Sequence, residues 1–110
     1  ILSERKEATN EKLYYALNLA QNAINIEPEN AIYLDTMGWI YYKLGIYNKA
    51  EEYLEKSLNI NNNNPVILEH MGDIYIKLKK INKALEVYSK ALKIDSDNVL
   101  IKEKIKNIYE

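Results

Sequence analysis

The sequence predicts an all-α fold, a right-handed superhelical solenoid in which antiparallel helix pairs stack as one domain. Three observations lead to this prediction. The chain matches itself when it is shifted by 34 residues. Apolar side chains recur every three or four residues, which is typical of helices with one buried face. The 110 residues include only three Gly and two Pro, too few for the many turns of an all-β fold.

The internal repeat is clearest between residues 31–64 and 65–98, which share 15 of 34 residues without a gap. We therefore expect one structural repeat in each range. The residues that recur at this offset are Gly38 and Gly72; Ala16, Ala50 and Ala84; Tyr41, Tyr75 and Tyr109; Ile26, Ile60 and Ile94; and Asn30, Asn64 and Asn98.

Each period predicts two helices joined by a short turn. In the first full period, apolar residues at helical spacing over 31–44 are followed by Gly45, a helix stop. Asn48 is expected to cap the second helix, which runs to Ile60. A polar connection follows, and Pro65 stands where the first residue of the next helix belongs.

Small residues explain how the two helices of a period approach each other. Gly38 and Gly72 lack a Cβ atom, and Ala50 and Ala84 offer small surfaces on the second helix. A large side chain at either glycine would overpack a helix pair whose axes lie roughly 8–10 Å apart.

This pattern resembles the tetratricopeptide repeat (TPR), over residues 10–109. Its apolar, Leu-Gly, Tyr, Ala, aromatic and Ala positions are read as Leu34, Met37-Gly38, Tyr41, Ala50, Leu54 and Ser57, then as Leu68, Met71-Gly72, Tyr75, Ala84, Tyr88 and Ala91. The usual proline is replaced by Asn62 and Ser96 and survives only as Pro28. The resemblance implies a noncatalytic module that binds other proteins.

Two shorter runs are similar to a subgroup of bacterial repeat proteins, several of them envelope lipoproteins. They are residues 35–39 (Asp-Thr-Met-Gly-Trp) and residues 70–73 (His-Met-Gly-Asp). This similarity implies a bacterial source, in either the cytoplasm or the envelope.

The two ends depart from the full repeat. Residues 1–30 are expected to be a partial repeat whose second helix covers about 10–26, after a polar loop over 3–9. Residues 99–110 are expected to be a capping helix, because Lys106 replaces the glycine and Lys102 the first apolar residue. We expect an excised fragment, since the chain begins at Ile1, with Glu110 at or near the natural C-terminus.

The N-terminal helix leaves a stripe of apolar side chains that needs a neighbour. The stripe comprises Tyr14, Leu17 and Leu19. A preceding helix of a longer protein would cover it, and so would a second copy of the chain, which makes a homo-oligomer possible.

Composition excludes several classes of function. The net charge of -1, from 15 basic and 16 acidic residues, gives no footprint for nucleic acid. There is no cysteine, so thiolate catalysis has no nucleophile, and the one histidine, His70, is the only candidate base for a serine–histidine mechanism. Glu69, His70 and Asp73 share one helix, but a second nitrogen or sulfur ligand is missing, so no metal site is predicted. No phosphate-binding glycine loop and no membrane-spanning stretch occurs, and we expect no cofactor.

The predicted binding surface is the concave groove, because the first helices of successive repeats line it. Its residues are expected to be Asp35, Trp39, Tyr42, Lys43, Glu69, His70, Asp73, Ile76 and Lys77. Trp39 is the expected centre, since exposed Trp and Tyr dominate binding hot spots. The alternative is that the preceding second helix covers Trp39. The three carboxylates would make the groove mildly acidic, which favours a ligand with apolar anchors and some Lys or Arg.

The TPR family includes a version that grips a C-terminal carboxylate with Lys and Asn side chains. The matching positions here hold Asp35, Trp39, His70, Leu100 and Lys104, so this mode of binding is not predicted. The sequence therefore predicts a noncatalytic module that binds a peptide or amphipathic segment of another protein. The alternative is a self-associating structural segment with no peptide in its groove.

Overall fold

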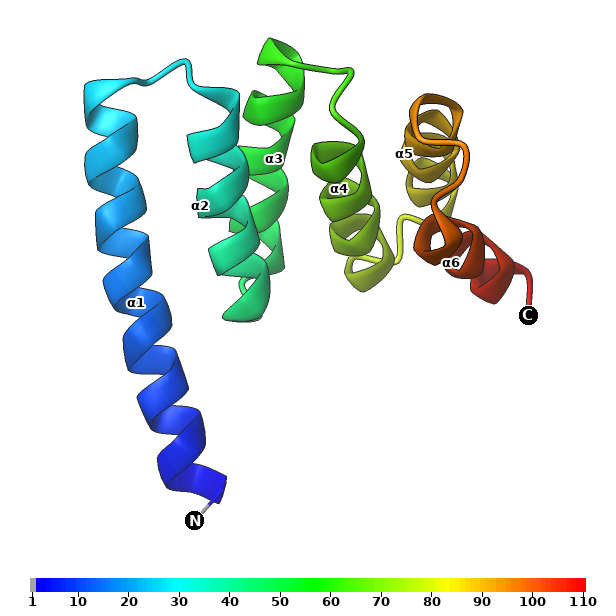
Figure 1. Cartoon of the computed structure of the whole chain (residues 1–110). Coiled ribbons are helices and arrows are strands. Elements are labelled where there is room, and N and C mark those ends of the chain that lie inside the picture. Colours follow the sequence, from blue (N-terminus) through cyan, green and yellow to red (C-terminus); the bar gives the residue numbers. More distant parts are fainter. Residues whose placement is uncertain (1) are drawn as a thin grey trace.

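The computed structural model describes the backbone of residues 2–110 and the side chains of residues 9–110, and it is helical throughout with no strand in that range. Successive helices lie side by side and run antiparallel, forming one row from α1 to α6 (Figure 1). The helices are α1 (Leu2–Ile26), α2 (Ala31–Lys43), α3 (Tyr47–Ile60), α4 (Pro65–Lys77), α5 (Ile81–Ile94) and α6 (Val99–Tyr109). The all-α prediction is confirmed.

The recurring asparagines cap the first helix of each unit. Asn30 Oδ1 accepts a hydrogen bond from the backbone N–H of Tyr33 at 3.1 Å, and Asn98 Oδ1 accepts one from Ile101 at 3.0 Å. Asn64 accepts from two amides at the start of α4, where Pro65 is the first helical residue. Each cap satisfies amides that have no partner inside the helix, so the 34-residue period fixes where these helices begin.

The turn inside each helix pair is tighter than the sequence suggested. Gly45 takes the left-handed conformation with φ 79°, and Lys79, at the matching place, takes it with φ 61°. The second helix then starts at once, and its N-cap is Ile46 rather than the expected Asn48. The amide of Ile46 donates to the Tyr41 carbonyl at 2.9 Å, so the turn closes through backbone groups and no capping side chain is used.

The glycines of the first helices lie against the second helices, as expected. A Cβ on Gly38 would come within 2.0 Å of Leu54 Cδ2, and a Cβ on Gly72 within 2.2 Å of the Tyr88 ring. Ala50, which faces the first of these contacts, is fully buried. The largest core cluster runs from α3 through α4 and α5 to α6, and a smaller one joins α1 to α2.

Helix α1 is longer than expected, since it begins at Leu2 and includes the predicted loop over residues 3–9. That segment reads SERKEAT, in which Glu, Arg, Lys and Ala are strong helix formers, so its composition favours continuing the helix. Ala20 and Ile24 are buried against α2, and Leu17 packs beside them rather than standing exposed.

Helix α6 forms the other end of the row. Ile101 is fully buried, and Ile105 and Ile108 pack against the main core cluster. Lys102 and Lys106 are exposed. Helix α6 is therefore apolar toward α5 and carries both lysines on its exposed surface.

Candidate functional site

Trp39 stands at the centre of an aromatic stack on the first helices. Its ring lies 4.5 Å from that of Tyr42 with an interplanar angle of 8°, and 4.0 Å from that of His70 with an angle of 17°. Trp39 is partly buried. The stack joins α2 to α4, so Trp39 packs against two other predicted groove residues.

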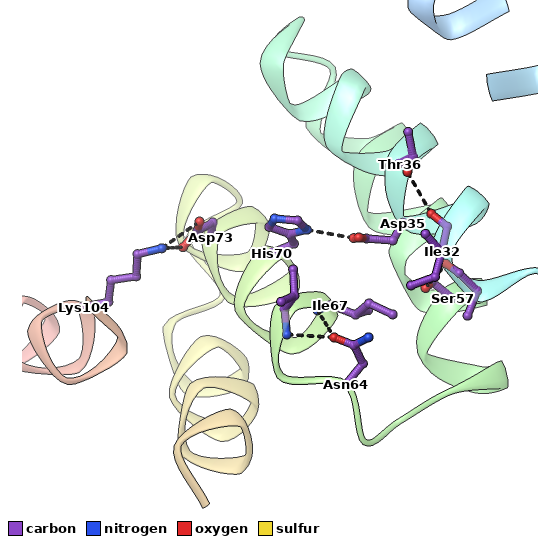
Figure 2. A network of polar contacts seen from close by, with 11 residues as sticks. Ile32, Asp35, Thr36, Ser57, Asn64, Ile67, His70, Asp73 and Lys104 are labelled. Carbon is purple, nitrogen blue, oxygen red and sulfur yellow. Dashed lines mark hydrogen bonds and ion pairs between the residues drawn. The ribbon is translucent and has the colours of Figure 1, made fainter. Parts of the chain in front are cut away.

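Asp35 holds the His70 ring of this stack in place through a hydrogen bond. Its residue exposure is only 7%, and its Oδ1 lies 2.8 Å from His70 Nδ1, which donates to it in the tautomer protonated there. Figure 2 shows the imidazole of His70 directed at this carboxylate. Asp35 therefore orients His70 and is not open to a ligand.

The same link recurs one repeat later. Glu69 Oε2 accepts a hydrogen bond from Lys104 Nζ at 2.5 Å. Asp35 and His70 are 35 residues apart, and so are Glu69 and Lys104. A carboxylate on each first helix thus pairs with the next first helix, and these pairs tie α2 to α4 and α4 to α6.

Asp73 is the junction of a second network. Its Oδ1 accepts a hydrogen bond from the Tyr88 hydroxyl at 2.5 Å, and its Oδ2 accepts one from Lys104 Nζ at 3.0 Å (Figure 2 shows the latter contact). Burial, and then the hydrogen bond to Asp73, raises the pKa of Tyr88, so its hydroxyl stays a neutral donor. Burial lowers the pKa of Lys104, but its bonds to Glu69 and Asp73 outweigh this and the net shift is upward.

A hollow of about 490 Å³ opens beside this network, between α4 and α6. Its lining residues are Tyr42, Asp73, Ile76, Lys77, Ile81, Tyr88, Lys104, Asn107 and Ile108. Isoleucine and tyrosine side chains form its walls, while Asp73, Lys104 and Asn107 supply polar groups. Such a mixture, mainly apolar with a few placed polar groups, suits one apolar side chain of a bound segment together with its neighbouring backbone.

The structure divides the predicted groove residues into two groups. Tyr42, Asp73, Ile76 and Lys77 line the hollow directly, and Tyr42 connects it to the Trp39 stack. The others lie beside it, in the stack, in the ion pairs or, for Lys43, exposed at the end of α2; they are Asp35, Trp39, Lys43, Glu69 and His70.

The expected acidity of the groove is reduced by hydrogen bonds and by one shared cation, Lys104. All three carboxylates that carried this expectation are engaged, Asp35 by His70, Glu69 by Lys104, and Asp73 by Tyr88 and Lys104. These bonds hold the helices in register, while the isoleucine and tyrosine walls of the hollow offer apolar contact.

Sequence reasoning missed the contribution of α6 to this site. Lys104, Asn107 and Ile108 all line the hollow, although α6 was expected only to cap the row. The repeat could have indicated Lys104, because it follows Glu69 at the spacing that separates Asp35 from His70. Tyr88 was assigned to the core, and its hydroxyl reaches the groove only because Gly72 lets its ring pass.

Two further properties of the described residues concern membrane spans and metal sites. Among residues 2–110, no helix combines the length and apolarity needed to cross a bilayer. In the same part of the chain, no three His, Cys, Asp or Glu side chains gather where a metal ion could be held.

Comparison with known sequences gives one family. The chain matches the family model described as anaphase-promoting complex, cyclosome, subunit 3, over residues 5–91. No curated protein matches it.

Comparison with solved structures gives many similar folds. The first TPR of Spaghetti (RPAP3), bound to the HSP90 peptide SRMEEVD, has a TM-score of 0.86 and 17% identity, over 96% of this chain and 85% of that one. The second TPR domain of human RPAP3, in complex with an HSP70 peptide, has a TM-score of 0.83 and 17% identity, over 98% and 92%. A TPR protein from Thermus thermophilus has a TM-score of 0.83 and 24% identity, over 94% and 53%. At these identities the likeness shows the fold alone.

Proposed function

We propose that this chain, which belongs to the anaphase-promoting complex subunit 3 family and has the TPR fold, binds a segment of another protein in the hollow between α4 and α6. The TPR fold is a protein-interaction scaffold, and two of the similar structures hold peptides. The proposed activity is noncatalytic, with a peptide or amphipathic helix as the ligand.

One observation carries this proposal, namely the convergence of apolar side chains from four helices, α2, α4, α5 and α6, on one open hollow. Tyr42 comes from α2, Ile76 from α4 and Ile108 from α6. Neighbouring carboxylates already accept hydrogen bonds from protein side chains, so a ligand that enters need not supply donors to them. An apolar or aromatic side chain of the ligand would fill the hollow. The side chains of Asn107 and Lys77, which also line it, could form hydrogen bonds with the ligand backbone.

The peptides in the similar structures are not the expected ligands. Those chains are described with HSP90 or HSP70 peptides, both of which end in EEVD. In this chain Lys104 is the cation at a matching position, and its ammonium is already bound to Glu69 and Asp73. A terminal carboxylate would have to compete with both, so we expect the peptide SRMEEVD not to bind.

A random peptide library selected on the immobilised chain tests the proposal. Selected peptides should share an apolar or aromatic anchor and should lose binding to an Ile76→Lys variant. Ile94→Lys is the matched control, because Ile94 is exposed on α5, outside the hollow. Peptides that bind Ile76→Lys as well as they bind the unaltered chain would refute this site.

The finer assignment to a bacterial protein also remains a proposal. It is supported by the runs at residues 35–39 and 70–73. Similar structures come from human, plant, fungal and bacterial proteins, so the fold does not decide it. The genome that carries the gene tests this point.

A further inference from the structure

Helix α1 has an open face that the matching helices do not have. In α3 and α5, the matching residues are fully or almost fully buried beneath the first helix of their own repeat; they are Ala50, Leu54 and Ser57, and Ala84, Tyr88 and Ala91. On α1 the same places hold Ala16, Ala20 and Ala23, of which Ala20 is already buried against α2 and the other two are partly buried. These three line an apolar hollow of about 360 Å³, shared with α2. In the described chain, no first helix lies on this face of α1.

Helix α6 has the corresponding open face, on which Lys102, Lys106 and Tyr109 are exposed. It stands at the position of a first helix, yet the described chain supplies no second helix behind it. Tyr75 is 8% exposed at the position where α4 meets α5, whereas Tyr109, its counterpart in α6, is 76% exposed. One end of the row thus has a second helix without its first helix, and the other end has a first helix without its second.

We propose that α6 of one copy occupies the hollow on α1 of another copy, so that the two half-repeats form a complete helix pair. The contact continues the interface that α2 makes with α3 and α4 makes with α5. It is head-to-tail and does not close on itself, so each added copy presents a new open end.

The 34-residue period predicts which side chains of α1 and α6 would be in contact in this interface. Tyr41 stacks on Tyr53 at 5.6 Å, and the Lys83 ammonium lies 5.8 Å from the centre of the Tyr75 ring. The residues of α1 that match Tyr53 and Lys83 are Leu19 and Tyr15, and Tyr109 matches the two tyrosines.

Tyr109 of one copy would therefore contact Leu19 and Tyr15 of the next. Leu19 is 52% exposed, Tyr15 is 67% exposed and Tyr109 is 76% exposed. Burying three large, exposed side chains in one contact is favourable, because it removes apolar surface from water.

The sizes of the residues at the glycine position and opposite it are also compatible with contact between α6 and α1. Gly38 faces Leu54, and Gly72 faces Tyr88, so each small residue lies opposite a large one. In the proposed pair the order is reversed, since Lys106 stands at the glycine position and Ala20 opposite it. The aliphatic stem of Lys106 would lie over the alanine surface, with its ammonium reaching water.

This contact is separate from the groove. None of Tyr15, Leu19 and Tyr109 lines the hollow proposed for the peptide. Failure of the self-association would therefore leave the proposed function intact, and failure of peptide binding would leave the self-association intact.

Sedimentation velocity of the unaltered chain, from low to high micromolar concentration, gives the first test. We expect the mean mass to rise continuously with concentration, as it does for open assembly. Leu19→Glu and Tyr109→Glu should each sediment as monomers, and both replaced residues are exposed, so the fold should survive. Asn22→Glu is the control, because Asn22 is exposed on α1 and does not line the hollow.

Mixing the two variants gives the sharper test. Leu19→Glu keeps an intact α6 and Tyr109→Glu keeps an intact α1, so an equimolar mixture should form a one-to-one dimer and grow no further. A symmetric contact between two α1 helices would instead leave Tyr109→Glu dimeric when alone, and it would overturn the proposal. An unaltered chain that stays monomeric throughout would also overturn it and would leave the hollow to a helix from a preceding segment.

Discussion

Replacing Gly72 with alanine tests the packing that positions the groove. A Cβ at this place would come within 2.2, 2.5 and 2.6 Å of three atoms of the Tyr88 ring. The ring is 2% exposed, and its hydroxyl is bonded to Asp73, so it cannot move aside freely. Overpacking costs about 1–3 kcal/mol, and a weakened bond to a charged group costs about 1.5–3 kcal/mol.

The better helix propensity of alanine returns about 1 kcal/mol. We therefore expect Gly72→Ala to lower the free energy of unfolding by about 2–5 kcal/mol. Urea denaturation followed by circular dichroism measures the change.

Two further variants, Gly38→Ala and a double variant, serve as controls for Gly72→Ala. Gly38→Ala should cost less, because the nearest atom there is the end of the Leu54 side chain, which turns more easily than a ring. Combining Gly72→Ala with Tyr88→Leu should cost less than the sum of the two single changes, since a leucine side chain turns away from the methyl group more easily than the ring does. A Gly72→Ala chain as stable as the unaltered one would refute the proposed contact between α4 and α5.

Three further predictions concern the groove, a turn and the response to alkali. Trp39→Ala should weaken binding of a library-selected peptide by about 2 kcal/mol or more, because Trp39 supports Tyr42 and His70; unchanged affinity in calorimetry would discard that role. Lys79→Gly should raise the free energy of unfolding in urea by roughly 1 kcal/mol, since Lys79 holds a left-handed φ of 61°, and a decrease would contradict this. Burial raises the pKa of Tyr75 to about 12 and also raises that of Tyr88, from an ordinary 10.0. Because the unfolded chain loses these protons first, stability should fall as the pH rises from 10 toward 12, and less steeply in Tyr88→Phe; an equally steep fall in that variant would contradict the shift.

The repeat made the fold predictable. A 34-residue period places Asn30, Asn64 and Asn98 at equivalent caps, and it places Gly38 and Gly72 at equivalent close contacts. The caps and the glycine contacts form between residues of one helix pair, and the repeat period fixes the positions of those residues. The start of α1 was less predictable, because a polar stretch of good helix formers reads equally as a loop or as the extension of a helix.

The groove was only partly predictable, because its chemistry depends on contacts between repeats. The sequence indicates which faces line the groove, and Tyr42, Asp73 and Ile76 do line the hollow. Which carboxylates are free depends on side chains that cross from one helix to the next. Asp35 therefore appeared as a groove acid from sequence, and in the structure it is buried against His70.

The most direct test of the proposed function is a nuclear magnetic resonance titration of the ¹⁵N-labelled chain with a library-selected peptide. The chemical shifts of amides around the hollow, at Ile76, Lys77 and Asn107, should change, together with the indole N–H of Trp39. Those of Ile60 and Ile94, exposed on the second helices, should stay where they are. Changes confined to the second helices or to α1 would contradict binding in the hollow.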